Sequence, residues 1–573
     1  IIHSPAVPAP SSPVRITVNA GGTSLVQLVH RLDNNNADAT WQRTAMSDDG
    51  SGGGDETAGD GIYTATLTQY PGSGSIVQFY AEATAAGRQT TLLPKLGRNR
   101  PAMYIVDDAP SSSDLQTQRF VISQYDRDAI SSSGYSNKYQ FNFPRMSNHY
   151  FNATFIHNER DIYYNAEIRK SGSPFTRSGG NGLDHGKWKL PGDRLLRGRG
   201  KTVIDPSGGN GGMRHNDRMA RYFLYQLGHP INEFEFVRVG INDSGFNLRE
   251  DMEPIANDFL RRNFEGGTNG TLLRIDDQWW FEDFNNDGTA PRRGSNADWR
   301  YKNTDEAIRY HSEWIMRSRE TDYEYTAFTE FLKNIRSGNE STLNRIIDPD
   351  MSGLNAAVRG YDADWDTLTL DRGKNGYFYR RPDGLWMLVH WDGDRTFENG
   401  RLGMSPLGGL NNVATYFNKP FVRRYMNHYL TELLDNHTRG SARTAAYMRA
   451  EEDASNAYPM DTNKFNNWFN NRSSRIRSFI GAPLNANFST TSPNSPTSAA
   501  DFDLSGTAPS SVYSIRISGH PEAVVTWNNT TNWTASGITL KTGNNSLVVE
   551  GVDSQGNVVE STSFSVNKNG NAP

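Results

Sequence analysis

The chain has 573 residues, which is long enough for three or four domains with separate hydrophobic cores. Its formal net charge of −5 argues against a nucleic acid as the main partner, and no apolar run is long enough to span a bilayer. The absence of cysteine excludes disulfides, thiol nucleophiles and cysteine-bound zinc. A low charged fraction of 21%, with abundant Gly, Asn, Ser and Thr, favours an extracellular protein.

Residues 1–110 predict an N-terminal β-sandwich of immunoglobulin-like type. Short runs with strand composition alternate with Gly/Asp turns, and no helical period appears. The runs are VRITVNA from Val14, SLVQLVHRL from Ser24, GIYTATL from Gly61 and SIVQFYAEAT from Ser75.

The loop between the second and third runs, from Ser47 to Gly61, is rich in Asp and Gly. Its glycines permit the tight turns that would let several carboxylates converge on a hard, oxygen-liganded ion such as Ca²⁺. The candidate ligands are Asp48, Asp49, Asp55 and Asp60. The spacing does not match an EF-hand loop, so a plain hairpin loop is the alternative to a structural calcium site.

Residues 115–482 follow the linker DDAPSSSD and predict a central α+β domain. Helices are expected over 213–227, over 321–338 after the capping box Thr321–Glu324, over 412–434 with an interruption at Pro420, and over 461–480. Asn285–Gly288 and Asp348–Asp350 are interpreted as turns, and an ion site at either is the weaker alternative. A Ser/Pro/Thr linker is expected over 483–500, followed by a second small immunoglobulin-like sandwich over 501–573. The sequence contains no HExxH, GxSxG or Walker A motif.

The stretch from Asp364 to Phe397 is the most informative part of the chain. YFYRR and LWMLVHW have strand composition, and the turn Pro382-Asp383-Gly384 between them predicts an antiparallel hairpin. Such a hairpin brings Asn375 and Asp392 to the same end, where one Mg²⁺ could contact both. Loops of this composition also bind structural Ca²⁺ or serve as polar turns, which is the alternative reading.

Protein-kinase-like folds present a catalytic Asp, a metal-binding Asn and a metal-binding Asp in this same order. Asp366 precedes Asn375 by nine residues, whereas ordinary protein kinases separate the corresponding residues by about five. The order therefore points to a kinase-like site that differs from that of an ordinary kinase.

The pattern W-D…N-x-Y-x-Y…W-x-(L/V)-x-x-W-D-x-D-x-x-F resembles the spore-coat CotH kinase family, secreted bacterial proteins with an atypical kinase fold. The resemblance extends over about residues 120–480 in family order. IRKSGSPFTRSG from Ile168 resembles an Arg/Gly/Ser-rich loop, and GKWKL from Gly186 resembles the lysine-bearing strand. MRHNDRMARYFLYQLG from Met213 resembles the next helix, and VRVGINDSGFNLRED from Val237 resembles a strand pair that ends in an acidic residue.

This resemblance implies a central atypical kinase-like domain between two sandwiches, with Asp366 as the catalytic carboxylate. It implies Asn375, Asp392 and Asp394 as metal ligands, with Asp392 favoured over Asp394. ATP phosphates would be contacted by Lys187 or Lys189 and covered by Arg169 and Ser173. An acidic partner, Glu250 or Asp251, would pair with the lysine or reach the metal. The stretch GFNLRED departs from the family pattern, so the register leaves the choice between these two acids open.

Two functions are expected from these features. The first is an extracellular or cell-surface enzyme, of bacterial origin, that uses ATP and Mg²⁺ to phosphorylate a surface protein. The second is a non-catalytic structural or adhesion protein of the cell surface with a degenerate kinase-like scaffold. With either function, the expected partners are a surface or extracellular protein and, in addition, further copies of the chain in a homo-oligomer or surface assembly. The chain begins at Ile1 without an initiator Met, as expected of a segment from which a secretion signal has been removed.

Overall fold

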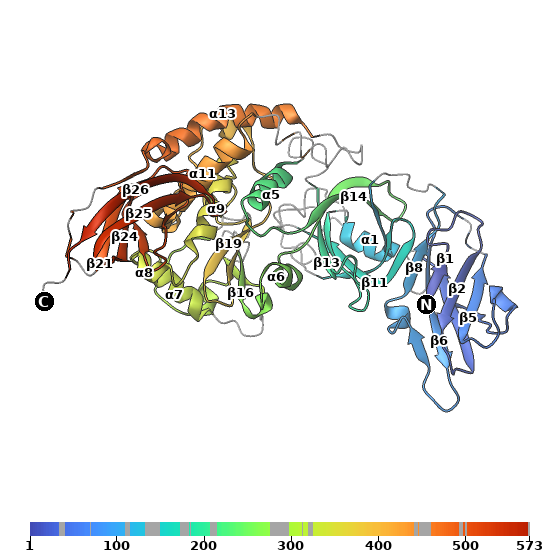
Figure 1. The fold of residues 1–573 in the computed structure, drawn as a ribbon. Coiled ribbons are helices and arrows are strands. Elements are labelled where there is room, and N and C mark those ends of the chain that lie inside the picture. Colours follow the sequence, from blue (N-terminus) through green and yellow to red (C-terminus); the bar gives the residue numbers. More distant parts are fainter. Residues whose placement is uncertain are drawn as a thin grey trace.

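The protein is a multidomain α+β chain with all-β antiparallel sheets at both ends, and its two termini lie at opposite ends of an elongated molecule (Figure 1). The structure is a computed structural model. It describes the chain except for residues 34–39, 69, 71, 109–114, 132–148, 172–182, 184, 207–214, 276–296, 312, 319–324, 441–444, 446–447, 449–459, 492–494, 496, 499–500 and 571–573.

The N-terminal module consists of two antiparallel sheets that share one core. The strand order of one sheet is β1 (Ile2–Ser4), β2 (Val14–Asn19), β5 (Ile62–Leu67). The strand order of the other is β4 (Gln42–Ala45), β3 (Leu25–Leu32), β6 (Ile76–Thr84), β7 (Thr91–Leu93). Strand β8 (Ala102–Ile105) also pairs with β6. The four strands expected from the sequence are confirmed, because alternate residues of each run are apolar and face the shared core. The immunoglobulin-like topology stays a prediction.

A closed β-barrel follows the N-terminal module. Its strands, in barrel order, are β10 (Phe151–His157), β11 (Asp161–Lys170), β12 (Gly186–Lys189), β13 (Lys201–Asp205), β15 (Asn247–Met252), β14 (Phe234–Ile241) and β9 (Thr117–Val121). Trp188 fills the interior and stacks on Phe155 with ring centroids 4.8 Å apart. The short helix α1 (Gln124–Ser131) follows β9.

Buried polar contacts hold the N-terminal module against the barrel. Arg119 on β9 is 1% exposed and pairs with Asp107 at 2.7 Å and with Glu159 at 2.9 Å. His3 on β1 contacts the hydroxyl of Tyr164 on β11 through its Nδ1, at 2.5 Å. Because a buried charge is costly unless it is paired, these contacts specify one docking geometry for the two parts.

The helical half packs around an antiparallel sheet and contains the largest core of the molecule. The sheet has the order β17 (Trp314–Met316), β16 (Thr271–Ile275), β18 (Gly376–Arg380), β19 (Trp386–His390). The helices are α5 (Asn216–Gln226), α6 (Asn257–Asn263), α7 (Thr326–Asn334), α8 (Glu340–Leu343), α9 (Pro349–Tyr361), α10 (Val413–Phe417), α11 (Pro420–Glu432) with a π-helical end at Leu433–His437, and α13 (Thr462–Ile480).

Several helix predictions are confirmed with shorter bounds. Pro420 separates α10 from α11 and occupies the first turn of α11, where its missing N–H has no intrahelical partner to lose. Asp461 caps α13 by accepting a hydrogen bond from the backbone N–H of Lys464. The capping box expected at 321–324, and Met213 of the expected helix over 213–227, lie outside the described residues.

The long helix α9 is missing from the sequence prediction, which read Asp348–Asp350 as a turn. Asp348 is the N-cap of α9 and accepts from the backbone N–H groups of Asp350 and Met351. Glycines lower the helix propensity of this stretch, but the fold needs them. A Cβ on Gly353 would lie 2.7 Å from Tyr425, and one on Gly360 would lie 2.4 Å from the carbonyl of Pro406.

The C-terminal module also consists of two antiparallel sheets around a common core. Their orders are β20 (Ser489–Thr490), β21 (Asp501–Thr507), β24 (Asn532–Thr539), β23 (Val524–Trp527), and β22 (Ser514–Ile517), β25 (Gly543–Val552), β26 (Val558–Lys568). Strand β20 lies inside the expected linker. The fully buried Arg424 of α11 ties this module to the helical half by donating to backbone carbonyls that include those of Thr530 at 2.9 Å and Pro509 at 2.5 Å.

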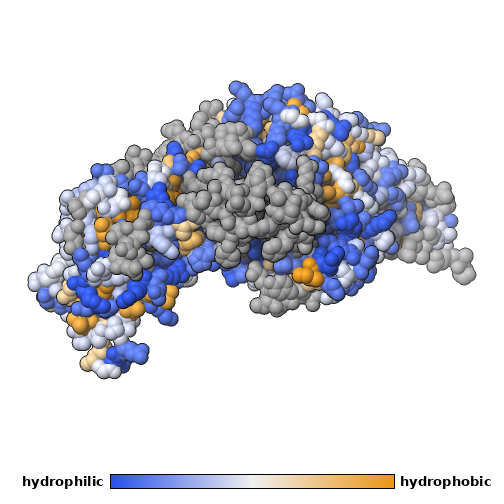
Figure 2. All heavy atoms as spheres, turned by 180° about the vertical axis from the view of Figure 1, so that it is seen from behind, coloured by the Kyte–Doolittle hydropathy of each residue, from blue (hydrophilic) through white to orange (hydrophobic). Residues whose placement is uncertain are grey.

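The exposed surface matches the low hydrophobic content of the chain. On the face in Figure 2, described hydrophobic residues are scattered in small groups among hydrophilic ones. Among the described residues, no helix is both long and apolar enough to cross a membrane.

Two buried histidines should make the protein less stable in acid. Burial is the main cause that lowers the pKa of His3 to about 4 and that of His390 to about 3. An unfolded histidine has a pKa of about 6.5, so unfolding takes up protons below that pH. The stabilisation is therefore complete above about pH 6.5 and is lost as the pH falls, at about 2 kcal/mol per histidine at pH 5.

Thermal melting of the wild type and of His3→Gln at pH 7.5 and pH 5.0 checks the contribution of His3. The wild type should lose more stability between the two pH values than His3→Gln does, because carboxyls with a raised pKa, such as Asp392, respond in the opposite direction in both proteins. His520→Gln is the control, because His520 is paired with Glu522 near the surface and should leave the wild-type response in place. Equal pH responses of His3→Gln and the wild type would contradict the assignment of a neutral, buried His3.

Candidate functional site

The hairpin expected from the sequence is present, and it places Asn375 and Asp392 at the same end, as predicted. Strands β18 and β19 pair antiparallel, with Gly376 opposite His390. Asn375 directly precedes β18 and Asp392 closely follows β19, so both lie at the same end of the hairpin. Both adopt left-handed backbone conformations, with φ of 52° and 59°. A non-glycine residue held in this region costs on the order of 1 kcal/mol and is typical of functional sites.

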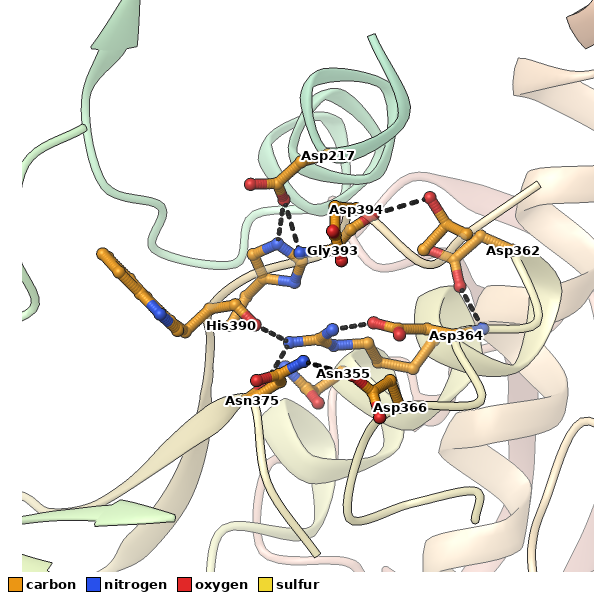
Figure 3. Close-up of polar contacts among 12 residues, drawn as sticks. Asp217, Asn355, Asp362, Asp364, Asp366, Asn375, His390, Gly393 and Asp394 are labelled. Carbon is orange, nitrogen blue, oxygen red and sulfur yellow. Dashed lines mark hydrogen bonds and ion pairs between the residues drawn. The ribbon is translucent and has the colours of Figure 1, made fainter. Parts of the chain in front are cut away.

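Asp366 lies in the loop after α9 and meets the hairpin end. The Asn375 Nδ2 donates to the Asp366 Oδ2 at 3.0 Å, and the Lys374 Nζ lies 2.8 Å from the same oxygen. Arg372 approaches the other carboxylate oxygen at 3.9 Å. Figure 3 shows Asp366 and Asn375 together below Asp217 and Asp394. Arg372 and Lys374 are two cationic side chains beside Asp366. The sequence did not predict them, because no sequence pattern assigns them to this site.

Asp392 and Asp394 are half-buried and lie among other carboxylates. Burial raises the pKa of Asp392, and the negative charges of Asp205, Asp217 and Asp366 raise it further, whereas Lys374 lowers it. The pKa of Asp394 is raised well above its usual range by burial and then by Asp392 and its neighbours. Carboxylate and amide oxygens are the hard donors that Mg²⁺ prefers, so Asp392, Asp394 and Asn375 could hold a Mg²⁺ ion whose charge would offset this repulsion.

The first turn of α5 holds the segment that carries these two aspartates. Asp217 accepts hydrogen bonds from the His390 Nε2 at 2.7 Å and from the backbone N–H of Gly393 at 3.0 Å (Figure 3). Asn216 donates to the backbone carbonyl of Asp394 at 2.9 Å. Although burial opposes it, the pKa of Asp217 is lowered by Arg221 and by the hydrogen bond from His390. Asp217 therefore stays ionised and serves as an acceptor that fixes the loop.

The strand register assigns faces to the candidate residues of the barrel. Lys187 pairs with Val203, and Asp205 pairs with Glu250. Because side chains alternate along a strand, these residues share the face opposite Trp188, which fills the barrel. Val203 also belongs to a cluster with Tyr377 and Val389 of the hairpin, so this outer face looks toward the helical half. Asp205 was missed by the sequence analysis because only the strand register places it here.

The register also separates Glu250 from Asp251, a choice that the sequence left open. Asp251 points into the barrel, where it accepts from the Gln118 Nε2 at 2.6 Å and lies 3.4 Å from Arg199. Glu250 has the opposite orientation and shares its face with Lys187. The placement thus favours Glu250 as the acidic residue on the barrel face that looks toward the helical half.

The other residues expected to contact the ATP phosphates are Lys189, Arg169 and Ser173. Lys189 lies on the same face as Lys187, but it pairs with Glu167 at 3.3 Å and covers the ring of Tyr150 at 3.9 Å. Arg169 is nearly buried and also lies against Tyr150, with its guanidinium 5.1 Å from the ring centre. Ser173 lies outside the described residues. Lys187 therefore remains the better placed of the two lysines.

The N-terminal Asp/Gly loop brings some of its carboxylates together. One carboxylate oxygen from each of Asp48, Asp55 and Asp60 lies within 4.8 Å of the others. Asp49 lies outside this group and accepts from the backbone N–H groups of Ser51 and Gly52 at 2.9 and 2.6 Å. The three grouped carboxylates also accept hydrogen bonds from backbone N–H groups in or directly after the loop. Calcium at this loop stays a prediction. Asn285–Gly288 lies outside the described residues.

Comparisons with known proteins were made against families, curated proteins and solved structures. Among curated proteins, none matches. Among solved structures, the twitchin kinase region from C. elegans (Fn31-NL-kin-CRD-Ig26) matches with 11% identity over 99% of this chain and 100% of that chain. Its TM-score is 0.14, and a similarity this low carries no argument about the fold.

The family comparison is specific. A family described as CotH kinase protein matches residues 194–480, which is half of the chain. The match includes α5, β18, β19 and every residue of the acidic site from Asp205 to Asp394. The chain therefore belongs to the CotH kinase family.

Proposed function

We propose that this protein is an ATP- and Mg²⁺-dependent phosphotransferase that modifies an extracellular or cell-surface protein. The observation that supports this most directly is the meeting of Asp366, Asn375, Asp392 and Asp394 at one half-buried place. They come from three separate chain segments, and each is of the residue type that phosphoryl transfer requires. Family membership supports kinase chemistry, and kinase chemistry implies the use of ATP.

The roles of the residues follow from their placement. Asn375, Asp392 and Asp394 would hold Mg²⁺, which supplies positive charge to the phosphate oxygens when it is bound. Lys187 would contact the nucleotide phosphates from the barrel side, and Glu250 would orient that lysine. Asp366 would accept the proton of the acceptor hydroxyl while the oxygen of that hydroxyl forms a bond to the γ-phosphorus of ATP. The bond from that phosphorus to the leaving oxygen then breaks, and ADP departs.

A second candidate is a structural protein of the cell surface that retains the fold without the reaction. The observation that favours it concerns the carboxylate of Asp366. Its Oδ2 already accepts a hydrogen bond from Asn375 and lies 2.8 Å from the Lys374 Nζ. A general base needs a free lone pair for the incoming proton, and in Asp366 the Oδ1, which accepts no hydrogen bond from the described residues, would have to supply it. In the catalytic reading, Lys374 moves to the transferred phosphoryl group, while in the structural reading it stays on Asp366.

The first test separates the metal role from the base role. Asp392→Asn should abolish Mg²⁺-dependent ATP binding in calorimetry, because it removes a charged ligand. Asp366→Asn should retain that binding and lose phosphoryl transfer to the protein itself or to a general acceptor, by about 100-fold or more. Asp383→Asn is the control, because Asp383 lies in the turn of the same hairpin and pairs with Arg381 at the surface.

Wild-type protein that binds no ATP in the presence of Mg²⁺ would favour the structural candidate. Equal ATP binding by Asp392→Asn and the wild type would contradict the metal assignment even if transfer is seen.

The calcium prediction for the N-terminal loop has its own test. Ion binding to the folded state alone raises the melting temperature, so the wild type should melt higher in millimolar Ca²⁺ than in chelator. Asp55→Asn should remove this difference, because Asp55 belongs to the group of three carboxylates. Asp49→Asn should keep it, since Asp49 lies outside that group of three. Coincident melting curves of the wild type with and without calcium would reduce the loop to an ordinary turn.

A further inference from the structure

Arg359 on α9 contacts the three chain segments that form the candidate site. It is 1% exposed and forms an ion pair with Asp364. Its Nη2 also donates to the backbone carbonyl of Asn375 at 3.0 Å and to that of Trp391 at 3.0 Å. One guanidinium therefore joins the loop after α9 to both strands of the hairpin, at the end opposite its turn.

Each of these contacts is next to a residue of the site. Asp364 precedes Asp366 by two residues, the second acceptor is the carbonyl of Asn375 itself, and Trp391 directly precedes Asp392. Asn375 and Asp392 have positive φ, and strained backbone of this kind persists only where the surroundings hold it. The hydrogen bonds to the carbonyls of Asn375 and Trp391 are such a restraint.

The chemistry of the side chain suits this task. A guanidinium is planar, stays charged and presents several N–H donors in a rigid fork, so it can serve several acceptors at fixed angles. A lysine ammonium would keep the charge but not the fork. Arg359 also provides a permanent positive charge among buried aspartates that include Asp217, Asp362 and Asp392.

We propose that Arg359 is the positioning residue that sets Asp366, Asn375 and Asp392 relative to one another. This inference rests on the proposed function for its catalytic consequence, although the restraint of the three segments can be measured without it. Arg359 touches neither nucleotide nor metal in this account. It acts through the backbone that carries the residues which do.

Arg424 offers a matched control. It is also fully buried on a helix of the same half and donates to several backbone carbonyls, but those belong to the C-terminal module. Substituting either arginine removes buried hydrogen bonds from the fold. Only the substitution of Arg359 should disturb the site.

The experiment compares Arg359→Lys with Arg424→Lys, both in the full chain, by hydrogen exchange and calorimetry. In Arg359→Lys, amide exchange should accelerate by about tenfold in segments 362–366, 374–376 and 391–394, whereas it should stay unchanged there in Arg424→Lys. The dissociation constant for ATP with Mg²⁺ should rise about 10- to 100-fold in Arg359→Lys only, as expected when an outer-shell partner is lost. Arg359→Met should give larger effects of the same kind, and circular dichroism checks that each variant is folded.

Unchanged exchange in the three segments of Arg359→Lys, or an equal acceleration in Arg424→Lys, would overturn the proposal. If the wild type binds no ATP, the proposed function fails. The exchange data then still decide whether Arg359 restrains the three segments.

Discussion

The repulsion among buried carboxylates is the constraint on which the central site depends. The charges of Asp205, Asp217 and Asp366 all raise the pKa values of Asp392 and Asp394, and burial makes this repulsion stronger than it would be in water. Arg221 neutralises Asp217, and Lys374 contacts Asp366. Lys374 and Arg359 bring positive charge to Asp392, yet the pKa values of Asp392 and Asp394 stay raised. A divalent cation would add the further counter-charge that these two carboxylates need, and an ATP-dependent kinase would supply one.

Buried charged side chains also assemble the larger structure. Arg119 fixes the N-terminal module to the barrel, Arg424 fixes the C-terminal module to α11, and Arg359 joins the loops of the site. Such groups contribute little net stability because their desolvation is costly, but removing one partner leaves another polar group unpaired. Their effect is therefore on geometry. Both β-modules are seated in defined positions relative to the parts they contact.

The sequence predicts local features well and long-range contacts poorly. Alternating strands, the Pro382–Gly384 turn and the interruption at Pro420 depend on neighbouring residues and are present as expected. The hairpin alone was enough to bring Asn375 close to Asp392. Helix α9 was missed because its glycines, which are required for close packing, resemble helix breakers. Asp205, Asp217, His390 and Arg359 were missed because their neighbours lie far away in the chain and no local pattern marks them.

The most direct test of the account is a crystal structure with Mn²⁺ and a non-hydrolysable ATP analogue, in which Mn²⁺ replaces Mg²⁺ and is located by its anomalous signal. The account predicts an anomalous peak bound by oxygens of Asp392 and Asn375, with the nucleotide phosphates between this ion and Lys187. Since carboxylates and amides bind Mn²⁺ in the same octahedral manner as Mg²⁺, the peak reports the native site. A nucleotide bound elsewhere, or no peak beside Asp392 at saturating Mn²⁺ and analogue, would contradict the central claim.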